Sequence, residues 1–284
     1  MKKKSIAIAT IFCVGALTLT SCKKPSGCTD DSILVTNFDP TAEEDDGSCV
    51  YSYALKAGET VVEGNITSNT TWTSDRVWVL PTRIAVESGA TLTIEAGTVI
   101  KGIPGTGANA SSLLIAQGAK IMANGTSSAP IIFTSTDDKI VSGEIASPNL
   151  NESQNAKWGG LIILGKAPIS ADASTAQIEG IPASDINGLY GGSDAADNSG
   201  KLEYVSVRHG GANIGEGNEI NGITFGGVGT GTVVNYIEVV GNQDDGVEFF
   251  GGSVNASNVI VMNVGDDAID GDQAYSGTIT NFAI

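Results

Sequence analysis

Two pairs of adjacent aspartates are the residues of this chain best suited to chemistry. Asp244 and Asp245 recur as Asp266 and Asp267, 22 residues later, in matching Gly-rich and apolar surroundings. Carboxylates held this close together have three uses. They accept hydrogen bonds from main-chain N–H groups in turns, they bind Ca²⁺, or one of them keeps a raised pKa and acts as a general acid. The residue types leave all three uses open.

Such aspartates must be positioned by an element that repeats with the same period. At the same spacing, Ile237 is equivalent to Val259 and Val239 is equivalent to Val261, and apolar residues alternate along both segments. A fixed period of this length is typical of a solenoid, in which each rung is one turn of stacked strands. We expect residues 53–284 to form an all-β, right-handed parallel β-helix of about 22 residues per rung. A β-sandwich is the alternative, disfavoured because it produces no such register.

Alternation along the strands also predicts which side chains form the core. The expected inward-facing residues are Val205, Val207, Ile223, Phe225, Ile237, Val239, Val247, Phe249, Val259, Val261 and Ile269. Two polar stretches, residues 136–157 and 170–199, interrupt the rungs. Long loops on a solenoid often form its binding face.

Several motifs carry a family resemblance, among them Gly89-Ala-Thr-Leu-Thr-Ile-Glu-Ala-Gly, Trp158-Gly-Gly-Leu-Ile-Ile-Leu-Gly and Arg208-His-Gly-Gly. Together with the Asp-Asp-Gly-Val-Glu-Phe-Phe-Gly-Gly segment from Asp244, they resemble a family of β-helix lipoproteins in the Bacteroidetes phylum. The resemblance covers nearly everything after residue 54. It implies the fold of the pectin-lyase-like superfamily and a place in the cell envelope, and it implies no established activity.

The aspartate pairs also resemble the paired-Asp motif of polygalacturonase-type glycosidases. Those enzymes carry a Gly-His-Gly and an Arg-Ile-Lys element after the pair, and neither follows here. Arg208 and His209, the only histidine, precede the aspartates and are the remaining candidates for a base and a proton carrier. A lone histidine beside two glycines is more typical of a surface turn. Catalysis as a polysaccharide lyase or glycoside hydrolase is therefore the alternative reading of the site, behind binding.

Three tryptophans are candidates for a platform on which a sugar ring stacks. Trp78 and Trp158 lie in apolar runs and are expected in the core. Trp72 is flanked by threonines, so we expect it to be the exposed one and the candidate for glycan stacking.

The first 21 residues have the pattern of an export signal, with three lysines followed by a short apolar stretch. Leu19-Thr-Ser-Cys22 resembles a bacterial lipobox, which implies cleavage before Cys22 and a lipid anchor on its thiol; an ordinary secretory signal is the alternative. Several acyl chains anchor a protein stably to a membrane. We expect an envelope protein on the outer membrane. Lys23 and Lys24, which follow the lipidated position, do not decide between the periplasmic face and the outer face.

Residues 22–52 form a linker and a small module. Cys28 and Cys49 are the even pair that remains in an oxidising compartment, so we expect a disulfide. The Cys…Asp-Asp-Gly-Ser-Cys spacing resembles thrombospondin-type-3-like calcium-binding spacers of the same phylum. That resemblance implies Ca²⁺ ligands among Asp39, Asp45 and Asp46, and a solvated acidic loop is equally compatible with the residues.

The formal net charge of −17 excludes partners recognised through a basic surface, such as nucleic acid. The bulk properties and motifs together predict a lipid-anchored envelope β-helix protein with a structural, adhesive or glycan-binding role, stabilised by Ca²⁺. Its expected partners are the membrane and either a polysaccharide or another envelope protein. The printed residues end at Ile284 within an apolar strand pattern, so we expect either further sequence or a partner to cover this end.

Overall fold

The computed structural model describes residues 24–215 and 218–284, and the chain divides into two compact units. Among the described residues, the first unit comprises 24–31 and Val35–Tyr51, and the second comprises Ser32–Leu34 and Ser52–Ile284. The predicted signal segment 1–21 and Cys22 lie outside the described residues. No helix in the described part of the chain is long and apolar enough to cross a membrane.

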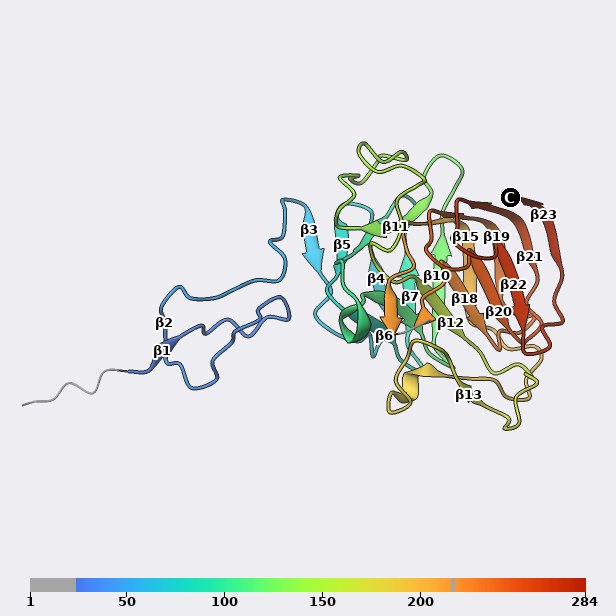
Figure 1. Ribbon diagram of the computed structural model, residues 1–284, viewed down its shortest axis with the longest axis horizontal. Coiled ribbons are helices and arrows are strands. Elements are labelled where there is room, and N and C mark those ends of the chain that lie inside the picture. Colours follow the sequence, from blue (N-terminus) through green and yellow to red (C-terminus); the bar gives the residue numbers. More distant parts are fainter. Residues whose placement is uncertain (1–23, 216–217) are drawn as a thin grey trace, which may run out of the picture. The chain divides into compact units, whose positions relative to one another are not determined.

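The second unit is built from parallel strands wound into a solenoid (Figure 1). An 11-stranded sheet contains β3 (Glu59–Val61), β4 (Thr70–Trp72), β5 (Val77–Leu80), β7 (Thr91–Ile94), β8 (Val99–Gly102), β10 (Lys120–Asn124), β11 (Ile131–Ser135), β15 (Gly200–Arg208), β19 (Val233–Val240), β21 (Ala256–Met262) and β23 (Ile279–Ala283). A six-stranded sheet contains β6 (Arg83–Val86), β9 (Ser112–Ile115), β12 (Leu161–Leu164), β18 (Ile223–Gly226), β20 (Val247–Phe250) and β22 (Ile269–Asp272).

The remaining elements are short. They are the antiparallel pairs β13 (Ala176–Gln177) with β14 (Leu189–Tyr190) and β16 (Asn213–Gly215) with β17 (Asn218–Glu219), and the 3₁₀ turns η1 (Gly107–Asn109) and η2 (Ile186–Gly188). The all-β parallel β-helix predicted from the sequence is thus confirmed.

Strand pairing follows the predicted register. Ile237 pairs with Val259, and Val247 pairs with Ile269, each 22 positions later. Ten of the eleven inward-facing residues predicted from the alternation are buried in one hydrophobic core, and the eleventh, Ile269, is half-buried against it. Phe249 packs within it between Phe225, at 5.2 Å between ring centroids, and Tyr275, at 4.4 Å. Phe225 and Phe249 stack because β18 and β20 pair in register.

One corner of the solenoid is turned by a single residue in the later rungs. The first half of β15 pairs with β10 and its second half with β11, so β15 bends from one face of the solenoid to the next. Tyr204 lies at the bend with φ of 50°, and Tyr236 follows in β19 with φ of 53°. Asn258 and Asn281 take the same place in β21 and β23, with φ of 56° and 54°.

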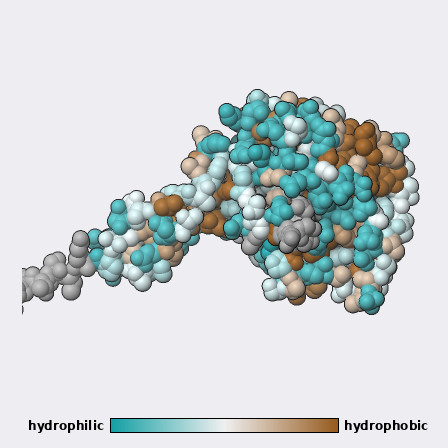
Figure 2. Space-filling model, in the orientation of Figure 1, coloured by the Kyte–Doolittle hydropathy of each residue, from teal (hydrophilic) through white to brown (hydrophobic). Residues whose placement is uncertain are grey.

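Two inserted loops cover the outer faces of the early rungs. The first loop comprises residues 136–157 and the second loop comprises residues 170–199. Ile140, in the first loop, packs on Val77, Val99 and Ile132 of the 11-stranded sheet. Ile178 and Ile181, in the second loop, belong to a cluster on the outer face of the six-stranded sheet. The first loop leaves the outer face of β19 and β21 exposed, and Figure 2 shows hydrophobic side chains gathered near the ends of these two strands.

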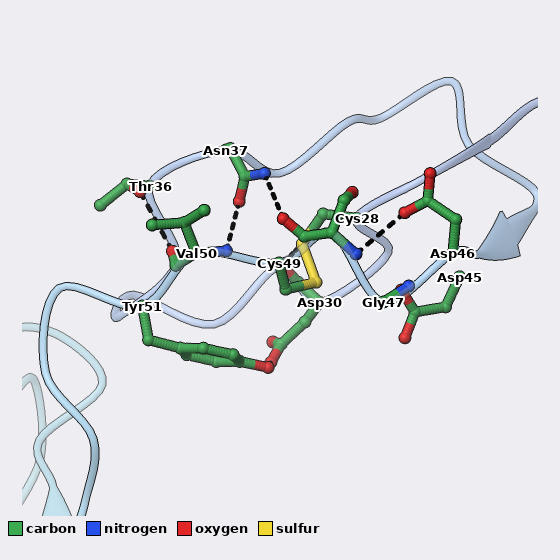
Figure 3. The surroundings of a disulfide bond; sticks show 11 residues. Cys28, Asp30, Thr36, Asn37, Asp45, Asp46, Gly47, Cys49, Val50 and Tyr51 are labelled. Carbon is green, nitrogen blue, oxygen red and sulfur yellow. Dashed lines mark hydrogen bonds between the residues drawn. A yellow bond between two sulfur atoms is a disulfide. The ribbon is translucent and has the colours of Figure 1, made fainter.

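The first unit is held by the predicted disulfide, which joins Cys28 to Cys49 with Cα atoms 4.7 Å apart (Figure 3). Strands β1 (Ser26–Gly27) and β2 (Glu44–Asp45) pair in parallel. Asn37 ties the chain next to the disulfide, accepting from the Val50 N–H at 2.7 Å and donating to the Ser48 carbonyl at 2.8 Å. With so little apolar core, such cross-links carry most of the module's stability.

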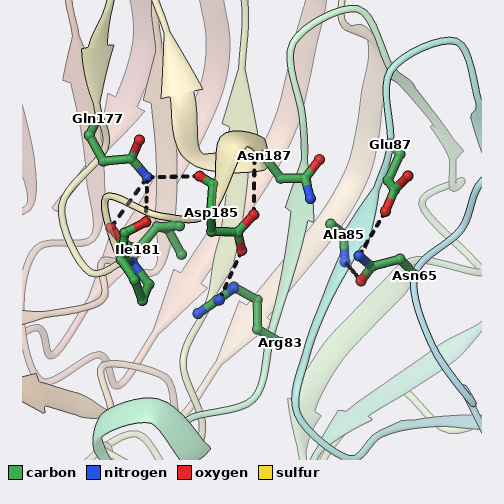
Figure 4. A network of polar contacts seen from close by, with 9 residues as sticks. Asn65, Arg83, Ala85, Glu87, Gln177, Ile181, Asp185 and Asn187 are labelled. Carbon is green, nitrogen blue, oxygen red and sulfur yellow. Dashed lines mark hydrogen bonds and ion pairs between the residues drawn. The ribbon is translucent and has the colours of Figure 1, made fainter.

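Polar anchors fix both loops to the strands. The buried Lys101 donates to the Asp138 carbonyl at 2.7 Å at the base of the first loop. In the second loop, Asp185 caps η2 and pairs with Arg83 of β6 at 2.9 Å (Figure 4). Gln177 donates to three main-chain carbonyls of the same loop (Figure 4). These contacts make the loops parts of the folded unit.

Candidate functional site

The six-stranded sheet changes character along its outer face. Its early strands present apolar residues, Leu114 and Ile162, that lie beneath the second loop. The next three strands continue the same stripe with Thr224, Glu248 and Asp270, which pair in register. Neighbouring strands are about 4.8 Å apart. Two acidic side chains are therefore stacked on an otherwise uncharged stripe.

The aspartates of the 22-residue repeat lie at the edge of this stripe. Asp245, in the turn before β20, accepts a hydrogen bond on Oδ1 from the Asp267 main-chain N–H at 2.9 Å. Its side chain joins two groups of three carboxylates, in each of which one oxygen per residue lies within 4.8 Å of the others. One group adds Glu248 and Asp270, and the other adds Asp244 and Asp266. We call these five residues the acidic cluster.

Asn221 takes the place of an aspartate one rung earlier, aligned with Asp245. It is 1% exposed, and its Nδ2 donates to Glu248 Oε2 and, at 3.4 Å, to Glu179 Oε1 of the second loop. Its Oδ1 is buried and has no hydrogen-bond partner among the described residues. A buried carbonyl oxygen without a partner carries a desolvation cost of about 1–3 kcal/mol.

Burial and mutual repulsion raise the pKa of two members of the cluster. The Glu248 pKa rises to about 9, because the side chain is buried and because Glu179 and Asp245 lie near, against the lowering effect of the Asn221 hydrogen bond. The Asp245 pKa rises to about 7, through burial and then through Asp244, Asp270 and Asp266, although the Asp267 N–H lowers it. Without a cation, Glu248 therefore holds a proton at neutral pH and Asp245 is partly protonated.

The two basic candidates do not join this cluster. The Arg208 guanidinium donates to the Ile145 carbonyl at 2.7 Å and pairs with Glu238 at 3.3 Å, on the outer face of the 11-stranded sheet. His209 is 2% exposed, and its Nδ1 lies 2.7 Å from the Gln154 carbonyl. The expectation of a surface histidine is wrong, because the end of the first loop packs over this turn. Burial lowers the His209 pKa.

Two further expectations concern single residues. Trp72 is 1% exposed and stacks on Trp78, with 5.5 Å between the ring centroids, so the prediction of an exposed platform for sugar is wrong. Thr71 precedes Trp72 in β4, where alternate side chains face opposite sides, and Trp72 faces the core. Asp267 contributes its main-chain N–H to the cluster, while its carboxylate lies outside both groups of three.

The aspartates of the small module have local partners. Asp39 accepts from Thr41, Asp45 from the Gly47 N–H and Asp46 from the Ser48 N–H. Neither acidic group of three found among the described residues includes any of them. These contacts are those of turn-capping aspartates, and calcium binding by the module stays a prediction.

Glu179 and Asn221 are members of the site that the spacing of the acidic pairs does not reveal. The match between residues 221–225 and 245–249 was itself sufficient to place Asn221 in line with Asp245. No local pattern marks Glu179, because it reaches the cluster from a loop whose path depends on distant contacts.

The stacked parallel strands define the class of this protein as a parallel β-helix. The family model of the pectate-lyase like beta helix domain matches residues 64–284, and the chain belongs to this family. Searches of curated proteins and of solved structures returned no match.

Proposed function

We propose that this protein is a lipid-anchored envelope protein that binds polysaccharide or another envelope component, and that Ca²⁺ held by Asp245, Glu248 and Asp270 stabilises its acidic face. The observation that carries the calcium assignment is the convergence of these three side chains, each with one oxygen within 4.8 Å of the others. Ca²⁺ prefers six to eight oxygen ligands in flexible geometry. Asn221 Oδ1, buried and without a hydrogen-bond partner among the described residues, is a neutral oxygen in the same stripe.

Electrostatics support a cation here. Like charges this close oppose one another's ionisation, and burial removes the water that would screen them. A divalent cation replaces the protons and lets the three carboxylates ionise together. The three carboxylates come from neighbouring rungs, so a bound ion would tie β20 to β22 and to the turn before β20.

The grouping of the carboxylates favours binding over glycoside hydrolysis. Glycoside hydrolases use one pair of carboxyl groups with separate roles. Here the carboxyl groups gather in threes, with one oxygen of each within 4.8 Å of the others in its group, as the oxygen ligands of one cation do. Arg208, the candidate base for a lyase, is engaged by Glu238 and the Ile145 carbonyl on a different sheet.

Catalysis remains the second candidate because of one observation: the raised Glu248 pKa keeps this carboxyl protonated at neutral pH, as a general acid requires. Incubation with acidic and neutral polysaccharides tests it, with reducing ends reporting hydrolysis and absorbance of unsaturated uronates reporting elimination. Turnover that is lost in Glu248→Gln would establish an enzyme and overturn the binding role.

The anchor rests on the lipobox-like Leu19-Thr-Ser-Cys22. Labelling of growing cells with a fatty acid analogue is expected to mark the protein and to leave Cys22→Ser unmarked and released from membranes. Labelling that persists in Cys22→Ser would refute the anchor.

Calorimetric titration tests the calcium site directly. The purified protein is expected to bind Ca²⁺ and to melt at a higher temperature with Ca²⁺ than with EDTA. Asp270→Asn should lose both effects, and Asp172→Asn, a change at an exposed position of the second loop, should retain them. If both variants bind Ca²⁺ equally well, the ion binds at another site. If neither variant nor the unaltered protein binds Ca²⁺, the calcium proposal is refuted.

A further inference from the structure

A groove of about 530 Å³ runs along the outer face of the 11-stranded sheet, on the later rungs that the first loop leaves uncovered. Ile145 of that loop borders it, and Tyr204, Tyr236 and Ile260 contribute its apolar lining. Its volume is that of a small-molecule site, for which about 300–1,000 Å³ is typical. The hydrophobic area near β19 and β21 in Figure 2 belongs to the same face of the sheet.

We propose that this groove binds a neutral oligosaccharide, independently of calcium. A sugar ring presents apolar C–H faces and a rim of hydroxyl groups, so it needs an apolar surface bordered by planar polar groups. Both halves of that requirement are met here by residues from successive rungs.

The apolar half centres on Tyr204 and Tyr236. Their rings stack at 4.3 Å between centroids with 5° between planes, and Tyr236 is 42% exposed. Both residues have positive φ, which is uncommon for bulky side chains and readily tolerated by asparagine. The next two rungs place Asn258 and Asn281 at the equivalent corner. Two strained tyrosines where asparagine suffices indicate a role for the rings beyond turning the chain.

The polar half is a connected trio, Ser206, Arg208 and Glu238, which also lines the groove. Arg208 Nε donates to Ser206 at 2.7 Å, Ser206 donates to Glu238, and Arg208 pairs with Glu238 at 3.3 Å. The Ile145 carbonyl takes a further Arg208 hydrogen bond. The guanidinium and carboxylate are thereby held in fixed orientations, which reduces the entropy lost when they bind hydroxyl groups.

Charge selects a neutral ligand. The Arg208–Glu238 pair adds no net charge to the groove, and the chain as a whole carries −17. A polyanion would meet long-range repulsion with no unpaired cation in the described lining to offset it.

An extended peptide fits less well. Peptides that add to sheets gain affinity from main-chain hydrogen bonds at a free edge. Here β19 lies between β15 and β21, paired to both, so the face of the groove offers side chains only.

Titration calorimetry with neutral hexasaccharides of glucose, xylose and mannose tests the proposal, with polygalacturonate as the charged comparison. At least one neutral hexasaccharide is expected to bind, with equal affinity in Ca²⁺ and in EDTA. Tyr236→Asn installs the residue that the next rung uses at this corner, so the fold is retained while affinity falls by about tenfold. Val233→Asn changes an equally exposed position of β19 outside the groove and should leave affinity unchanged.

Glu238→Gln is the second variant, which keeps the shape of the side chain and alters the polar trio; it should also weaken binding. The proposal is overturned if no neutral hexasaccharide binds, if Tyr236→Asn binds as well as the unaltered protein, or if only polygalacturonate or an unrelated peptide binds. Binding abolished by EDTA would assign the sugar to the acidic face, which would refute this inference and leave the proposed calcium site intact.

Discussion

Replacing Glu248 by glutamine should stabilise the calcium-free protein at alkaline pH. The glutamine amide has the size of a protonated carboxyl group and can still accept the hydrogen bond that Asn221 donates. It carries no charge at any pH, so it removes the conflict between Glu248 and its acidic neighbours. A stabilising substitution at a buried charged residue is the signature of a site adapted to a ligand.

The size of the effect follows from the Glu248 pKa, which is raised from 4.5 to about 9 by burial, Glu179 and Asp245. Because the folded pKa is the higher one, the folded state binds the proton more tightly. That stabilisation is complete below about pH 4.5 and is lost as the pH rises through about 9. At about pH 8 the loss reaches about 5 kcal/mol, at about 1.4 kcal/mol per pKa unit.

Thermal melting in EDTA, near pH 4 and near pH 8, measures the effect. Glu248→Gln is expected to melt about 10 °C above the unaltered protein at the higher pH and at nearly the same temperature at the lower. Added Ca²⁺ should reduce or reverse the difference, because only the unaltered protein keeps the carboxylate. Glu152→Gln, an exposed position in the first loop, is the control. Equal melting of Glu248→Gln and the unaltered protein at both pH values would refute the reasoning.

Three further perturbations test the fold. Cys28→Ser should lower the stability of the small module by about 3 kcal/mol and leave the solenoid unchanged, as hydrogen exchange of each unit would reveal; unchanged exchange in the module would contradict this. Lys101→Met removes the donor to the Asp138 carbonyl and should speed proteolysis within residues 139–157, whereas the exposed Lys139→Met should not. Phe249→Ala should cost about 3–5 kcal/mol in denaturant unfolding, and a loss below about 1 kcal/mol would contradict the stacked core.

The solenoid was predictable from the sequence because its register is a local property. Ile237 with Val259 and Val247 with Ile269 pair as the 22-residue spacing requires, and alternation along the strands identified the core. The same 22-residue offset recurs between β4 and β7, between β5 and β8, between β19 and β21 and between β20 and β22, so a single chain contains several independent observations of one geometry.

The outer faces were harder to predict. Alternation along a strand predicts which side chains point outward. It does not predict which of these side chains are covered by a loop. His209 points away from the core and is nevertheless buried beneath the end of the first loop. Glu179 reaches Asn221 from the second loop across 42 residues of sequence. Contacts of this kind depend on the path of an irregular segment, for which the sequence has no period.

The register also governs how such a chain can lengthen. A duplicated rung copies its outward side chains onto the rung beside it, at the spacing of one strand, so an acidic position becomes a row of like charges. On this sheet Thr224 precedes Glu248 and Asp270, and Asn221 precedes Asp245. An amide or hydroxyl thus stands beside the acids in each row and limits the accumulated charge. Duplication of an acidic rung would add like charges that a neutral neighbour or a bound cation must offset.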